Sequence, residues 1–168
     1  MGSSHRGVIS GSGVMNVKIE IQEINRSMSS AVTATSLRSR SSAGLSPRRR
    51  IVVSSVHNDT RYMMRVLLEM WGYEVSEATG LDDTLESARD NHADLILLDT
   101  SREFENDLEM ISTLSHSKEL GWAQVIVMSG YSQRRYQRAA LECGASGFLT
   151  KPLDLDLFES YVRTALNN

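Results

Sequence analysis

Three polar residues each stand directly after a short apolar run: Asp99, Ser129 and Lys151. Apolar runs of this length, each followed by a helical pattern, are typical of buried parallel strands. The carboxyl ends of such strands share one edge of an open sheet, and ligands bind there. The sequence therefore predicts that a carboxylate, a hydroxyl and an ammonium converge. This trio suits chemistry on a phosphoryl group, because the carboxylate can attack phosphorus while the other two hold phosphoryl oxygens.

Strand and helix patterns alternate along the chain from residue 50. Strands are expected near residues 51–55, 73–77, 94–99, 124–129 and 147–150. Helices are expected near residues 59–71, 82–92, 107–115, 133–143 and 155–166. Alternation with short connections implies a parallel sheet with right-handed crossovers, so the sequence predicts an α/β fold with the three polar residues at one edge.

Several helix ends carry residues with a physical reason to begin or end a helix. Gly72 and Gly144 are expected to adopt the left-handed turn that follows a helix. Side chains expected to accept amide hydrogen bonds at helix starts are Asn58 or Asp59, Ser132 and Asp154. The last helix carries an apolar stripe that should face the core: Leu155, Phe158, Val162 and Leu166.

The first 49 residues differ in composition from the rest of the chain. Residues 27–46 consist largely of Ser, Ala, Thr and Arg, which offer little to bury. We therefore expect a disordered Ser/Arg-rich segment over residues 1–49 and one globular domain over residues 50–168. Within the segment, residues 17–22 alternate apolar and polar side chains. This pattern indicates either a transient extended stretch or a strand added to a sheet edge or a partner.

The net charge of −3 conceals two parts of opposite sign. Residues 1–50 contain eight basic and two acidic residues, whereas the remainder contains ten basic and nineteen acidic residues. The basic segment could contact the acidic domain, an anionic surface or nucleic acid. No aromatic residues alternate with its arginines to stack on bases, so a solvated linker is favoured over a nucleic-acid contact.

Composition excludes two classes of protein. The chain contains one cysteine, Cys143, so it has no internal disulfide framework, and this suits a reducing compartment. No apolar run approaches the roughly 20 residues that a membrane span requires. We therefore expect a cytoplasmic protein that does not enter the membrane.

The order and spacing of Asp99, Ser129 and Lys151 resemble the receiver domain of bacterial response regulators. The resemblance extends from Arg50 to the end of the chain, and residues 144–153 form its most specific stretch. It implies a flavodoxin-like, doubly wound fold whose five parallel strands lie in the order 2-1-3-4-5. It also implies a signalling module of a phosphorelay rather than an enzyme.

The resemblance assigns a role to each matching residue. Asp99 corresponds to the phosphoacceptor, and Ser129 to the hydroxyl that binds the phosphoryl group. Lys151 corresponds to the lysine that pairs with the phosphoacceptor and precedes a cis bond to Pro152. Phe148 corresponds to the aromatic switch residue, whose orientation is linked to Ser129.

Two positions depart from the family in a way that affects metal binding. Receiver domains carry an acidic pair at the end of the first strand, where this chain has Ser55 and Val56. Mg²⁺ prefers oxygen ligands, usually one or two carboxylates together with water. Only Asp99 and the backbone carbonyl of Ser101 remain as expected ligands, so we expect weak Mg²⁺ binding.

The stretch after Asp99 is also atypical. Arg102 and Glu103 stand where the family usually has Met and Pro. Nearby His57 and Glu105 could in principle rebuild a metal site, but ligand geometry would also have to be correct, which disfavours this reading.

These observations leave two main functional hypotheses. The first is a stand-alone receiver that accepts a phosphoryl group on Asp99 from a histidine kinase or phosphotransfer protein and signals to a downstream protein. The second is a pseudo-receiver that acts as an interaction module without phosphorylation. A third reading, a dehalogenase-type phosphohydrolase, requires an acid–base aspartate where this chain has Ser101.

Overall fold

The computed structural model describes residues 48–100 and 104–167. The expected disordered segment falls almost entirely outside the described residues, as do the strand pattern over residues 17–22 and the atypical stretch at Ser101, Arg102 and Glu103. These expectations, and the domain boundary at residue 50, stay predictions.

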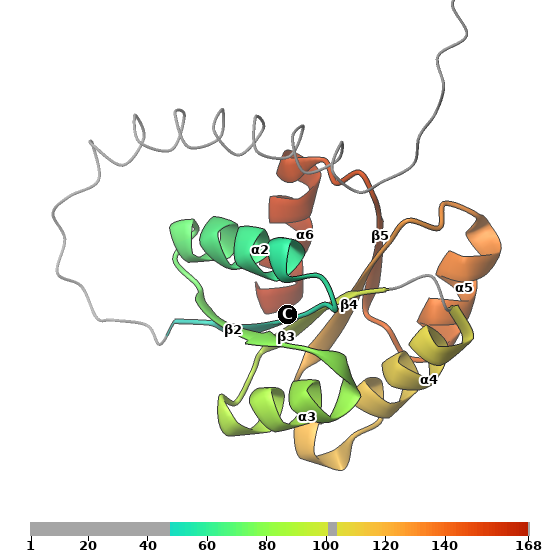
Figure 1. Ribbon diagram of the computed structural model, residues 1–168, viewed down its shortest axis with the longest axis horizontal. Helices are drawn as coiled ribbons and strands as arrows, with labels where there is room; N and C mark the ends of the chain where they lie inside the picture. The colour runs from blue at the N-terminus through green and yellow to red at the C-terminus, as the bar shows by residue number, and fades with distance from the viewer. Residues whose placement is uncertain (1–47, 101–103, 168) are drawn as a thin grey trace, which may run out of the picture. The chain divides into compact units, whose positions relative to one another are not determined.

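Five strands and five α-helices alternate along the described part of the chain (Figure 1). The strands are β1 (Arg50–Ser54), β2 (Glu74–Ala78), β3 (Leu95–Asp99), β4 (Gln124–Ser129) and β5 (Gly147–Thr150). The α-helices are α2 (Asn58–Met70), α3 (Gly80–Asp90), α4 (Phe104–Ser115), α5 (Arg134–Glu142) and α6 (Leu155–Asn167), with a short 3-10 helix η1 (Lys118–Leu120). The five predicted strands and five predicted helices match the strands and α-helices in number, type and order, whereas η1 was not predicted.

The sheet has the strand order β2-β1-β3-β4-β5, and all neighbouring strands are parallel. This confirms the doubly wound, flavodoxin-like arrangement. The register pairs Ser54 with Leu98, and Asp99 with Met128, at the carboxyl ends of the strands. The polar residues that follow these strands are therefore brought to one edge of the sheet.

Each face of the sheet is covered by helices, because alternate side chains along a buried strand point to opposite faces. Helices α2 and α6 cover one face, and α3, α4 and α5 cover the other (Figure 1). In β3, Leu95 and Leu97 join the first layer, whereas Ile96 and Leu98 join the second. Three members of the α6 stripe are buried in the first layer, as predicted: Phe158, Val162 and Leu166.

Two glycine predictions and one capping prediction are confirmed. Gly72 and Gly144 have φ values of 92° and 102°, in the left-handed region that glycine reaches without strain. The backbone N–H of Leu157 donates to Asp154 Oδ1 at 2.9 Å, so Asp154 closes the start of α6.

The capping predictions for α2 and α5 are wrong. The residue that precedes α2 is His57, and it makes no side-chain cap; Asn58 lies inside the helix, where its side-chain oxygen accepts a hydrogen bond from Arg61. Ser132 lies one residue before Gln133, the extended residue at the start of α5, so its hydroxyl is not at the capping position.

Candidate functional site at the carboxyl edge of the sheet

Asp99 is the last residue of β3, and its side chain is only 1% exposed. Its two carboxylate oxygens take hydrogen bonds from different elements. Lys151 Nζ forms an ion pair with Oδ1, and Ser55 Oγ donates to Oδ2 at 2.7 Å. A buried carboxylate needs such partners, because an unpaired charge removed from water is costly. The protein therefore satisfies both oxygens of Asp99 from its own side chains.

Ser55 follows β1, and its N–H, hydroxyl and carbonyl groups all form hydrogen bonds. Its N–H donates to the carbonyl of Ala78 at 3.1 Å, and its hydroxyl oxygen accepts the N–H of His57 at 3.0 Å. Its carbonyl accepts Nη1 of Arg61 at 2.6 Å. These contacts orient the hydroxyl proton towards Asp99.

Ser129 ends β4 and is fully buried. Its hydroxyl oxygen accepts the backbone N–H of Tyr131 at 3.1 Å, and its carbonyl accepts the backbone N–H of Lys151 at 2.8 Å. The latter bond ties the ends of β4 and β5 together. Lys151 thus lies beside Ser129 along the backbone and reaches Asp99 with its side chain.

Lys151 and Pro152 are joined by a cis peptide bond, as the family resemblance implied. Phe148, three residues earlier in β5, is 8% exposed and packs in the layer under α3, α4 and α5. It pairs with Val127 of β4. Its role as a switch, and the coupling of its orientation to Ser129, stay predictions.

Among the described residues, the side chains at this edge do not fit a Mg²⁺ ion. The Ser55 hydroxyl already donates to Asp99, and the side chain of Val56, which has no polar atom, is exposed to solvent. Over residues 48–100 and 104–167, no group of three His, Cys, Asp or Glu side chains is arranged to hold a metal ion. Ser101, the other expected ligand, lies outside the described residues.

Sequence reasoning missed the arginine that contacts the site. Arg61, in the first turn of α2, donates to the carbonyl of Ser55 and lies 3.5 Å from Glu77 of β2. A signal was present, since an arginine six residues after a strand-end serine falls in the first turn of the following helix. The residues themselves give no indication of which backbone carbonyl it would bind.

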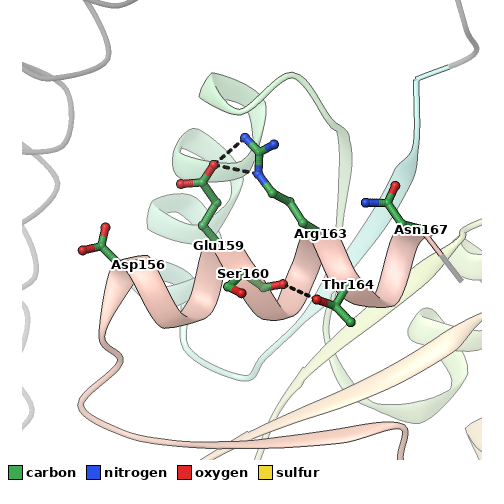
Figure 2. Close-up of a pocket in the computed structure, with 6 residues that line it drawn as sticks. All are labelled: Asp156, Glu159, Ser160, Arg163, Thr164 and Asn167. Atoms are coloured by element: carbon green, nitrogen blue, oxygen red, sulfur yellow. Dashed lines mark hydrogen bonds and ion pairs between the residues drawn. The ribbon is translucent and has the colours of Figure 1, made fainter.

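A separate hollow lies on the surface of α6 (Figure 2). Its lining comes from one helix: Asp156, Glu159, Ser160, Arg163, Thr164 and Asn167. Glu159 and Arg163 are paired with each other at 2.6 Å, and the Thr164 hydroxyl donates to the carbonyl of Ser160 at 2.8 Å. Its charged pair is already satisfied, and it contains none of the strand-end residues that suit phosphoryl chemistry.

The fold, with its strand-end aspartate, serine and lysine, is that of a receiver-type signalling domain. The response regulator receiver domain family matches residues 51–163, and the chain belongs to that family. Receiver domains are the signalling modules of two-component systems, so the class of function predicted from the sequence is confirmed at this level.

Relatives of this chain include one regulator that is much longer than the match and one that the match nearly spans. The transcriptional regulatory protein ZraR of Escherichia coli K12 is 34% identical over 105 residues, which are 62% of this chain but only 23% of ZraR. The polar-differentiation response regulator DivK of Brucella ovis is 26% identical over 106 residues, which are 63% of this chain and 86% of DivK. The chain thus spans less than a quarter of ZraR.

Solved structures with the same fold include two response regulators. One from Thermotoga maritima has a TM-score of 0.65 at 21% identity and covers 73% of this chain and all of its own. One from Burkholderia pseudomallei, solved with a phosphorylated aspartic acid, a calcium ion and citrate, has a TM-score of 0.58 at 22% identity and covers 71% of this chain and 75% of its own. Both share the fold with this chain.

Among the described residues, none of the helices has the length and apolar character needed to cross a bilayer.

Proposed function

We propose that this chain is a receiver domain of a phosphorelay with Asp99 as the phosphoacceptor and with impaired Mg²⁺-dependent phosphorylation. The observation that carries the proposal is the hydrogen bond from the Ser55 hydroxyl to Asp99 Oδ2, at the position where receiver domains carry a carboxylate. Asp99 keeps the lysine partner of a receiver site, but Ser55 and Val56 stand where an acidic pair would attract a divalent cation.

The chemistry follows from the residues at the edge. An oxygen of Asp99 forms a bond to phosphorus as the P–N bond of a phosphohistidine breaks, and the imidazole nitrogen retains the electron pair of that bond. Lys151, already beside Asp99, and the Ser129 hydroxyl hold the phosphoryl oxygens. The phosphorylated aspartic acid of the Burkholderia protein gives a precedent for this product in the same fold.

The reaction should be slow for two reasons. Phosphoryl transfer depends on positioning and on positive charge around the transferring oxygens. Lys151 supplies one positive charge at Asp99, whereas a bound Mg²⁺ would add two, and the residues present do not favour its binding. In addition, the hydrogen bond from Ser55 and the ion pair with Lys151 draw electron density from the two oxygens of Asp99 and make them weaker nucleophiles.

The partners proposed for this domain follow from its class. A histidine kinase or a phosphotransfer protein would supply the phosphoryl group, and a downstream protein would bind the domain. A cytoplasmic location suits such a role and is part of the proposal.

A second candidate is a pseudo-receiver that acts as an interaction module without phosphorylation. The pairing of Asp99 with Lys151 favours it, because the pair is neutral and is stabilised without a cation. In this case Asp99 would be a structural residue of the edge.

Intact-mass spectrometry after incubation with acetyl phosphate and Mg²⁺ separates the two candidates. The proposal predicts slow addition of one phosphoryl group to the wild type and none to D99N. Absence of the added group from the wild type, under conditions that label an ordinary receiver domain fully, would favour the pseudo-receiver. Addition to both proteins would show that another residue accepts the phosphoryl group.

A further inference from the structure

We infer that Arg61 is a positioning residue that holds the Ser55 hydroxyl on Asp99. The inference deepens the proposed function, since it takes Asp99 as the functional carboxylate of this edge. Arg61 reaches Asp99 through Ser55: its Nη1 donates to the Ser55 carbonyl at 2.6 Å, and Ser55 Oγ donates to Asp99 Oδ2 at 2.7 Å.

The guanidinium of Arg61 joins three parts of the fold. Besides the Ser55 carbonyl after β1, its Nη2 donates to the side-chain oxygen of Asn58 at 3.1 Å, at the start of α2. Its Nε lies 3.5 Å from Glu77 Oε2 on β2. The side chain is only 16% exposed. A planar guanidinium presents its donors in a fixed fork, so contacts in several directions fix its position.

Glu77 anchors this guanidinium from the neighbouring strand. It lies in β2 opposite Val53 of β1, two residues before Ser55. Its Oε1 also lies 2.7 Å from Nε of Arg65, with which it forms an ion pair. Two arginines one helical turn apart therefore share one carboxylate, but of the two only Arg61 is hydrogen-bonded to Ser55. This difference provides a matched control within the same helix.

The contact with Arg61 can affect the Ser55 hydroxyl because the backbone of Ser55 is hydrogen-bonded on both sides of its Cα atom. Its N–H donates to Ala78, which extends the pairing of β1 with β2 by one residue, and its carbonyl is held by Arg61. A peptide carbonyl fixed in this way limits rotation about the backbone next to the Cα atom. On this fixed backbone the Ser55 hydroxyl donates to Asp99 Oδ2, and its oxygen accepts the N–H of His57.

The test uses the carboxyl carbon of Asp99 in protein labelled with ¹³C-aspartate, assigned by its loss in D99N. The chemical shift of this carbon responds to hydrogen bonds on the carboxylate. We expect S55A to move the resonance, R61Q to move it in the same direction by most of that amount, and R65Q to leave it in place. In the S55A background, R61Q should add no further shift.

Three results would overturn the inference: a folded R61Q protein with an unmoved Asp99 resonance, an equal shift in R65Q, or an R61Q shift that persists in the S55A background. The last result would mean that Arg61 acts on Asp99 directly. R61K keeps the positive charge but has fewer hydrogen-bond donors than arginine, so it should move the resonance less than R61Q does. If R61Q does not fold, E77Q, which weakens the anchor of Arg61, takes its place with the same expected direction.

This measurement requires no phosphorylation. A protein that resists labelling by acetyl phosphate can still show the R61Q shift, in which case the positioning role stands and the phosphoacceptor role of Asp99 does not. Conversely, a protein that is labelled on Asp99 but shows no R61Q shift keeps the proposed function and loses the role of Arg61.

Discussion

A hydroxyl at position 55 changes both the ligands and the charge around Asp99. The ion pair with Lys151 leaves the edge near neutrality, and the hydroxyl adds a donor where a carboxylate would add an acceptor. Two additional carboxylates would repel Asp99 and favour binding of a cation between them, since like charges close together disfavour ionisation. Ser55 and Val56 carry no charge, so this repulsion is absent.

The double variant S55D/V56D tests this explanation. We expect it to be less stable than the wild type without Mg²⁺, because the added carboxylates lie near Asp99, and to regain stability when Mg²⁺ binds the folded state. Its labelling by acetyl phosphate should be faster than that of the wild type. Thermal unfolding with and without Mg²⁺, together with intact-mass time courses, measures both effects.

The same variant can also show whether something other than the missing metal limits phosphorylation. If S55D/V56D binds Mg²⁺ and yet is labelled no faster, the missing metal does not limit phosphorylation. The charged stretch at Arg102 and Glu103 would then be the next part of the edge to replace.

Lys151 should matter for stability as well as for chemistry. Among the described residues, its removal in K151M leaves the Ser55 hydroxyl as the one side-chain donor to the buried Asp99 carboxylate. Loss of one partner of a buried charged group costs about 1–3 kcal/mol or more. We expect K151M to lower the free energy of unfolding in urea by this amount, and D99N/K151M to lower it by less than the sum of the two single changes. Equal stability of K151M and wild type would show that the ion pair does not stabilise the fold.

At the scale of elements, the glycines after α2 and α5 provide a matched comparison. Both have positive φ values, but an added Cβ at Gly72 would meet open space, whereas at Gly144 it would lie 2.8 Å from the Cβ of Ser115. We expect G72A to cost about 1–2 kcal/mol through backbone conformation alone. G144A should cost more, because the last turn of α4 must also move. Urea unfolding of both variants measures the difference, and equal costs would contradict the packing argument.

The sequence predicts the strands better than the helix starts. Every strand lies within one residue of its predicted bounds, and in β1, β3 and β4 a buried apolar run marks the extent of the strand. Helix α4 begins at Phe104, three residues before the predicted start, and α3 begins two residues early, at Gly80. At α3 the backbone N–H of Thr79 donates to the Asp83 carboxylate at 2.7 Å, a contact between residues four apart that an apolar pattern does not reveal.

In the candidate site, contacts that follow from strand order are predictable from the sequence, whereas contacts that depend on side-chain rotamers are not. The convergence of Asp99 and Lys151 follows from strand order, since parallel strands end at one edge. The bond from Ser55 to Asp99 and the clamp by Arg61 depend on rotamers and on the path of the chain between β1 and α2. Those details are set by packing of α2 against the sheet, and a strand or helix pattern does not contain them.

At the scale of the whole molecule, the fold depends on burial of one apolar layer on each side of the sheet. Phe158 of α6 is fully buried in the layer under α2 and α6, and its ring lies 5.5 Å from that of Trp71 at the end of α2. F158A should therefore lower the free energy of unfolding by about 3–5 kcal/mol. The neighbouring Leu157 is 52% exposed, so L157A should stay within about 0.5 kcal/mol of the wild type. Urea unfolding followed by tryptophan fluorescence compares the two, and a small effect of F158A would contradict this view of the core.

Calorimetric titration of the wild type with Mg²⁺ tests the central claim most directly. Ser55 and Lys151 already satisfy the two oxygens of Asp99, and Ser55 and Val56 provide no acidic pair to attract a cation. The central claim therefore predicts no saturable heat of binding in the low millimolar range, and a saturable signal in S55D/V56D. Tight, saturable binding to the wild type that disappears in D99A would contradict it, because other ligands would then have rebuilt the metal site around Asp99.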